Sequence, residues 1–128
     1  MSEALSNDME THLLNYTFTT TSVTRPTAWY IALHTSDPTD AGSNEISGNG
    51  YVRQSVTFAV SGNTATTNSV VTFPACTGST WGTITHCSIW TAQTSGTMIG
   101  HSGLTASKTI AVGDIMQCAS GSIVFTLT

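Results

Sequence analysis

Alternation of apolar and polar residues, interrupted by short turn sequences, is the feature that most constrains how this chain can fold. From Ala28 onward apolar residues recur at every second position, as in Trp29, Ile31 and Leu33. Side chains two residues apart lie on the same face of a β-strand, so this pattern predicts strands with one buried face. Gly, Asn, Asp and Pro separate the alternating segments and are typical of turns.

About eight short strands are expected in this part of the chain. They lie within residues 29–34, 52–60, 65–73, 83–91, 97–104, 108–112, 115–118 and 123–127. Short strands with regular turn signals predict a mainly β protein with a single antiparallel β-sandwich, for which a jelly roll is the simplest arrangement. The sandwich domain is expected to span residues 28–128, with a long surface loop between its first two strands.

Residues 1–27 have a different pattern and predict a short N-terminal helix followed by an extended arm. Ser6 is a suitable N-cap, and Asp8 and Glu10 in the first turn complement the helix dipole. The helix is expected from near Asn7 to near Thr17, where a Thr-rich run begins to favour extended backbone.

The predicted helix carries apolar residues that we expect on one side of it. These residues are Met9, Leu13, Leu14, Tyr16 and Phe18. Two interpretations remain open: the side is an interface for neighbouring molecules, or it packs on the chain's own sandwich.

Charged residues are scarce, at 8% of the 128 residues, whereas Ser and Thr make up about a third of the chain. A surface with so few charges is interpreted as one largely covered by neighbouring subunits, with a neutral free β-domain as the alternative. Three basic residues and a formal net charge of -4 argue against nucleic-acid binding. No apolar run reaches membrane-spanning length, and the N-terminus lacks the features of a signal peptide, so synthesis in a cytoplasm is expected.

Catalytic and metal-binding motifs are not recognised, and the chain is predicted not to be an enzyme and to need no cofactor. A structural role is expected for each of the four histidines, and the three cysteines are interpreted as small buried side chains. Asp37, Asp40, Asn44 and Glu45 carry oxygen ligands suited to Ca²⁺, but they lack the spacing of an EF-hand loop, so no metal site is predicted. Trp81 is expected either to be exposed or to cap the edge of the core.

Several segments resemble a family of small virion proteins of tailed bacteriophages. They are LSNDMETHLLN, WYIALHTSDPTDAG, EISGNGYVRQ, WGTITH and SGLTASKTIAVGD. The resemblance runs in the same order along nearly the whole chain. Members of this family are often described as tail fibre-like, and related small β-proteins act as capsid cement or decoration proteins. The resemblance therefore implies a structural protein of the virion.

Two functions follow from this resemblance as hypotheses. The first is a capsid cement protein on the outside of the virion shell, a homotrimer that binds the major capsid protein and stabilises its lattice. The helix or the arm would then contact neighbours. The alternative is a tail-associated fibre or receptor-binding module that recognises a host surface glycan. In that case the exposed contacts are expected to be Asp37, Asp40, Glu45 and Trp81.

Overall fold

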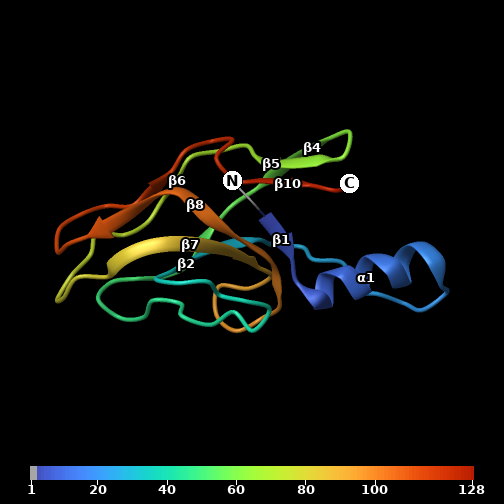
Figure 1. Cartoon of the computed structure of the whole chain (residues 1–128), viewed down its shortest axis with the longest axis horizontal. Helices are drawn as coiled ribbons and strands as arrows, with labels where there is room; N and C mark the ends of the chain where they lie inside the picture. The colour runs from blue at the N-terminus through green and yellow to red at the C-terminus, as the bar shows by residue number, and fades with distance from the viewer. Residues whose placement is uncertain (1–2) are drawn as a thin grey trace.

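β-strands packed in two layers form the body of this protein (Figure 1). The computed structural model describes residues 3–128 and is 37% strand and 10% helix. The antiparallel sheets and the single short helix confirm the prediction of a mainly β, sandwich-like fold. The jelly-roll arrangement stays a prediction.

The larger layer is a five-stranded antiparallel sheet. Its strands, in spatial order, are β1 (Glu3–Leu5), β8 (Met98–Ile110), β7 (Gly82–Trp90), β2 (Tyr30–His34) and β3 (Gln54–Ser55). The long β7–β8 hairpin forms the centre of this sheet.

The second layer consists of two small antiparallel sheets. Three strands form one of them, in the order β10 (Val124–Thr126), β5 (Thr64–Thr67) and β4 (Phe58–Ser61). The other pairs β6 (Val71–Thr72) with β9 (Gln117–Cys118). Figure 1 shows these strands on the opposite side of the molecule from β2 and β7.

The strand boundaries correct the sequence prediction at three places. Residues 52–60 form two strands, β3 and β4, and residues 65–73 also form two, β5 and β6. In the first case the chain crosses from the main sheet to the second layer, and both layers face one core, so the alternation continues through the break. Residues 97–112, predicted as two strands, lie mostly in the single strand β8. Strand β1 is not predicted from the sequence, because three residues are too few to show a period.

Helix α1 spans Asn7–Phe18, as predicted. Ser6 is its N-cap and accepts a hydrogen bond from the backbone N–H of Met9 at 3.1 Å. The helix begins directly after β1 and projects from one end of the two layers (Figure 1). Residues 19–29 then return to β2 without helix or strand.

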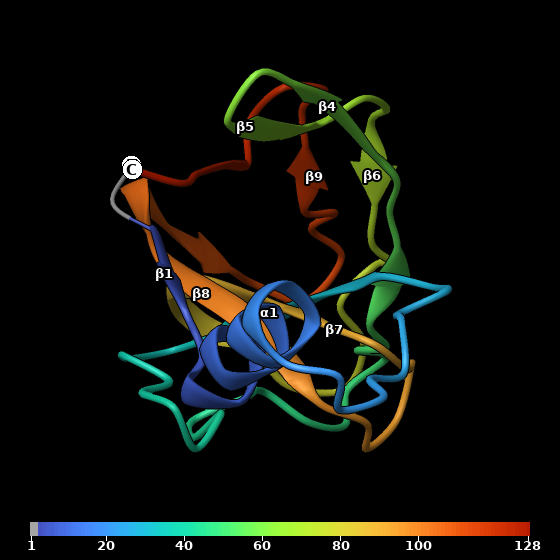
Figure 2. The same ribbon diagram turned by 90° about the vertical axis from the view of Figure 1, so that its right-hand side faces the viewer.

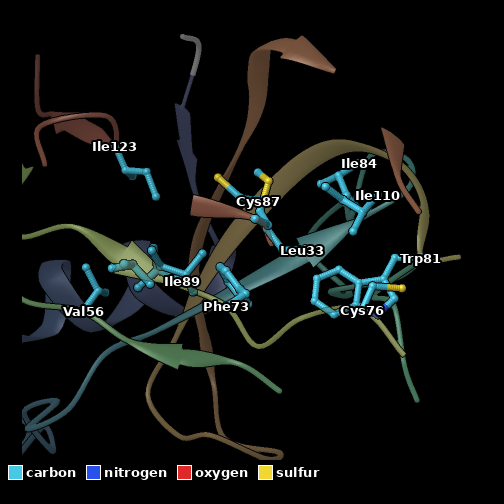
Figure 3. Packing of buried hydrophobic residues seen from close by; sticks show 13 residues of the cluster. Leu33, Val56, Phe73, Cys76, Trp81, Ile84, Cys87, Ile89, Ile110 and Ile123 are labelled. Atoms are coloured by element: carbon cyan, nitrogen blue, oxygen red, sulfur yellow. The ribbon is translucent and has the colours of Figure 1, made fainter. Parts of the chain in front are cut away.

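The core lies between the layers and is filled by aliphatic side chains around Phe73 (Figure 3). Tyr51 packs on Phe73 and meets Trp81 edge to face, with ring centroids 5.7 Å apart in the second pair. Cys76 and Cys87 are buried, which confirms their interpretation as small core residues. Burial raises the pKa of the Cys87 thiol to about 12.

Candidate interaction surface

The loop between β2 and β3, residues 35–53, covers the outer face of the main sheet. Ala32 and His34 on that face of β2 are completely buried, so both faces of this strand are covered. In Figure 1 the loop runs along β2 and β7 on the side away from the second layer. The long loop predicted from the sequence therefore packs on the outer face of the main sheet as a third layer and does not extend freely into solvent.

Arg53 holds this loop in place. Its guanidinium donates to both carboxylate oxygens of Glu45, each at 2.8 Å. It also donates to the backbone oxygens of Ala92 and Ser95, and its Cζ lies 4.0 Å from the ring centroid of Trp90. We call Glu45, Tyr51, Arg53 and Trp90 the Arg53 cluster.

The carboxylate of Glu45 is fully engaged within this cluster. The Tyr51 hydroxyl donates to its Oε2 at 2.6 Å, while the side chain is only 21% exposed. Burial alone raises the pKa of Glu45, but hydrogen bonds from Arg53 and Tyr51 outweigh burial and leave the pKa below its ordinary value. The expectation that Glu45 is an exposed contact is therefore wrong, because an ion pair draws it inward.

A buried hydrogen-bond chain connects the same loop to β7. Trp90 Nε1–H donates to Ser88 Oγ at 2.7 Å, and Ser88 Oγ lies 2.7 Å from His34 Nε2. His34 Nδ1 lies 2.8 Å from the carbonyl oxygen of Ser43, which only accepts, so Nδ1 carries the proton of the neutral ring. Ser88 then donates to Nε2.

This serine–histidine pair has no contact with solvent, since Ser88 is 1% exposed and His34 is 0% exposed. A substrate cannot reach a nucleophile that is buried at Ser88. The partner of His34 Nδ1 is the backbone carbonyl of Ser43, whereas a catalytic triad has a carboxylate at that place. Burial also lowers the pKa of His34. The pair therefore serves to hold residues 35–53 against the sheet, in agreement with the structural role predicted for His34.

Trp81 is buried, at 5% exposure, so the expectation that it is an exposed contact is wrong. Its indole N–H donates to the carbonyl oxygen of Asn49 at 2.8 Å, and its ring packs against Tyr51. The alternative expectation, that it caps the core edge, is confirmed. Asn49 and Tyr51 are about thirty residues away in sequence, and for this reason the local pattern around Trp81 does not reveal its burial.

Asp37 and Asp40, in the first part of the 35–53 loop, are exposed, as expected. Asp37 accepts from the backbone N–H of Thr39, and its Oδ1 lies 3.8 Å from Nδ1 of His101. Within residues 3–128 no group of three or more His, Cys, Asp or Glu side chains could hold a metal ion.

Helix α1 exposes most of its apolar side chains. Met9 is buried and anchors the helix, whereas Leu14 is 59%, Tyr16 74% and Phe18 78% exposed. Leu13 lies at the boundary, at 36%. Of the two open interpretations of this helix, packing on the chain's own sandwich therefore holds for Met9 but not for the last two turns.

The apolar residues of α1 occupy two faces, not one as expected. Each helical residue advances by about 100° around the axis, so Leu14 lies about 140° and Phe18 about 180° from Met9. Met9, Leu13 and Tyr16 form the inner face, and Leu14 and Phe18 form the outer face. The split follows from the residue spacing itself, so the expectation of a single apolar side is wrong.

Beside the inner face of α1 lies an apolar cleft of about 450 Å³. It separates the N-terminal segment from the ends of β4, β5 and β10. The residues that we use to define the cleft are Leu13, Arg25, Trp29, Val60, Phe125 and Leu127. Val60 and Leu127 are 75% and 54% exposed, so the rim of the cleft is apolar and open.

Comparison with known families identifies the class of protein to which this mainly β chain with an exposed apolar helix belongs. The chain is a structural protein of a bacteriophage virion, of the fibre type. It belongs to the Gp80 family, described as podophage GP4 fiber I protein gp80, whose model matches residues 4–126. No curated protein matches the chain. No helix among residues 3–128 is long and apolar enough to cross a membrane.

Proposed function

We propose that this chain is a tail-associated fibre subunit of a podophage, in which the sandwich is a rigid body and the 35–53 loop contacts the host surface. The observation that carries the proposal is the family match, which extends over residues 4–126 and has a fibre protein as its description. A structural role without catalysis, cofactor or nucleic acid is part of this proposal.

The construction of the 35–53 loop supports a contact role. Loops that bind partners work best when a rigid scaffold positions them. The Arg53 cluster and the His34–Ser88 pair hold the loop against the main sheet, while Asp37 and Asp40 are exposed to solvent. Exposed carboxylates accept hydrogen bonds from sugar hydroxyls, so a host surface glycan is the ligand class that we propose.

This site differs from the one expected from the sequence. Trp81 is removed from it by burial, and Glu45 by its ion pair with Arg53. The remaining contacts are polar, and they come from the first part of the loop at Asp37 and Asp40.

The location of the protein in the particle tests the fibre proposal. Cryo-electron microscopy of purified virions, with gold-labelled antibody against this chain, should place label at the tail. Quantitative mass spectrometry should find tens of copies per particle, in a multiple of the tail symmetry. Label spread over the head, with hundreds of copies, would instead support the capsid cement hypothesis, in which a trimer of this chain binds the major capsid protein.

Host recognition is tested separately with the purified protein. We expect it to bind host surface polysaccharide, and we expect the double variant Asp37→Asn, Asp40→Asn to bind at least tenfold more weakly. Gln93→Ala is the control, because Gln93 is an exposed polar residue on another loop. Equal binding by both variants would remove the 35–53 loop from the recognition site without affecting the location in the tail.

A further inference from the structure

The most exposed apolar surface of the molecule lies on the last two turns of α1 and continues into the rim of the apolar cleft. We propose that this surface is an interface between copies of this chain, in which the outer face of α1 and the cleft rim of one copy are covered by the same elements of a second copy. The inference goes beyond the location in the tail and does not depend on it.

The first observation is the distribution of apolar residues around α1. A surface helix normally keeps one polar side toward water, whereas a helix that is apolar on several sides is normally buried. The domain covers Met9 on the inner face but leaves Leu14 and Phe18 on the outer face in solvent. In Figure 2 the helix stands in front of the sheets. The covering element must therefore come from another molecule.

The second observation is the apolar cleft that adjoins the helix. Its volume of about 450 Å³ is of the size that a few large side chains fill. Leu13, on the inner face of α1, lines the cleft, so the inner face and the cleft form one continuous apolar surface, and Leu14 and Phe18 lie on the neighbouring outer face of the same helix. Val60 and Leu127 extend that surface onto the second layer.

The third observation is charge. Helix α1 carries Asp8 and Glu10 in its first turn and has no basic residue in its last turn. Arg25 lines the cleft, is exposed, and has no acidic side chain of residues 3–128 within ion-pair distance. An acidic helix from one copy and a cleft edged by a cation on the next are complementary.

These observations favour a second copy over an unrelated partner. The exposed helix and the cleft lie at the same end of one chain, so each copy offers both halves of the contact. Two copies can then satisfy each other through one repeated contact, which is the simplest rule for a homo-oligomer.

The oligomeric state of the purified full-length chain tests the proposal. Sedimentation velocity over a hundredfold concentration range should show an oligomer that dissociates on dilution. The double variant Leu14→Ser, Phe18→Ser should raise the dissociation constant at least thirtyfold. Its matched control is Val112→Ser, Ile115→Ser, which removes two exposed apolar side chains far from α1 in sequence, each 57% exposed, and should leave association unchanged.

A charge variant provides a second measurement that does not alter the helix. Arg25→Glu should weaken association at least fivefold at low salt, and Arg25→Lys should preserve it. Lys108→Glu is the control, since Lys108 is an exposed cation on β8. Circular dichroism and thermal unfolding will establish that each variant is folded before its association is compared.

Three outcomes would overturn the proposal. A wild-type chain that is monomeric at every concentration would do so, as would an oligomer that survives Leu14→Ser, Phe18→Ser. Protection of α1 only in the intact virion would also contradict it and would assign the surface to another virion protein. None of these outcomes bears on whether label is found at the tail, so this proposal and the fibre proposal can fail separately.

Discussion

Arg53 and Glu45 form a bidentate ion pair, with both N–O distances equal to 2.8 Å. The pair is largely buried, since the two side chains are 8% and 21% exposed. The remaining guanidinium nitrogen bonds the backbone of the 91–97 loop at Ala92 and Ser95. One side chain therefore fixes two loops that are about forty residues apart, and the shape of that end of the molecule depends on it.

Replacing Arg53 should destabilise the protein more than removing any exposed charge. Arg53→Met leaves the Glu45 carboxylate buried without its cation, a change that typically costs about 3–5 kcal/mol. Urea unfolding should show this loss, whereas Lys108→Met, which removes an exposed cation, should change the free energy of unfolding by less than about 0.5 kcal/mol.

A double variant distinguishes pairing from packing in the Arg53 cluster. Arg53→Met combined with Glu45→Leu should recover part of the lost stability, because no buried charge is then left alone. If the loss of stability in the double variant equalled the sum of the losses in Arg53→Met and in Glu45→Leu, the ion pair would not be the source of the loss.

Stability should fall as the solution becomes acidic, in two steps. Burial lowers the pKa of His34 below 6.5, so the unfolded state binds a proton more readily than the folded state. The contribution of His34 is therefore complete above pH 6.5 and is lost as the pH falls from 6.5 toward its folded pKa. The pKa of Glu45 is also lowered, so its contribution is lost as the pH falls below 4.5.

Urea unfolding between pH 8 and pH 2 measures both steps. In His34→Asn the slope between pH 6.5 and pH 5 should flatten, even though the variant is less stable at every pH. A free energy of unfolding that rises as the pH falls from 7 to 5 would contradict the neutral, buried state of His34.

The sequence predicts those parts of the fold that depend on neighbouring residues. The span of α1 follows from the Ser6 cap and the acidic first turn, and β2 and β7 follow from strict alternation. The strand breaks near residues 56 and 69 are not predictable in this way. At the first break the chain changes layer, and at the second it passes from one small sheet of the second layer to the other, while its apolar side chains continue to face the same core.

The candidate site is predictable only in part for the same reason. The apolar residues of α1 are visible in the sequence, and so is the loop that contains Asp37. The pairing of Glu45 with Arg53 and the contact of Trp81 with Asn49 join residues that only the folded chain brings together. These tertiary contacts explain why Glu45 and Trp81 do not have the exposed role predicted for them.

Gly42 should not tolerate a side chain, because Trp90 occupies the space where it would lie. A Cβ at this position would be 2.5 Å from Cζ2 of Trp90, and the backbone φ is +69°. Gly42→Ala should lose about 1–2 kcal/mol from the left-handed backbone and about 1–3 kcal/mol more from the clash.

Gly48→Ala is a matched control for this effect. Gly48 has nearly the same φ, +71°, but no atom lies within 4 Å of the place that its Cβ would take. The difference between the two variants in free energy of unfolding therefore isolates the contact with Trp90. Equal losses would mean that the 35–53 loop moves away from Trp90 at little cost.

Ser6 should determine how firmly α1 is held against β8. Its Oγ accepts from the N–H of Met9 and donates to the carbonyl oxygen of Met98 at 2.6 Å, and its own N–H donates to the oxygen of Ile99. Ser6→Ala removes both side-chain bonds and should cost about 1–2 kcal/mol, because a helix cap is lost and a buried carbonyl loses a partner.

Hydrogen exchange can detect this loss locally. Amides of α1 should exchange at least tenfold faster in Ser6→Ala, while those of β7 should keep their protection because the core is unchanged. Ser6→Thr, which retains the hydroxyl, should restore much of the protection, and Ser107→Ala, at an exposed position of β8, should have no effect. Unchanged exchange in Ser6→Ala would mean that Met9 alone anchors the helix, and the exposed Leu14 and Phe18 would then depend on that one side chain for their position.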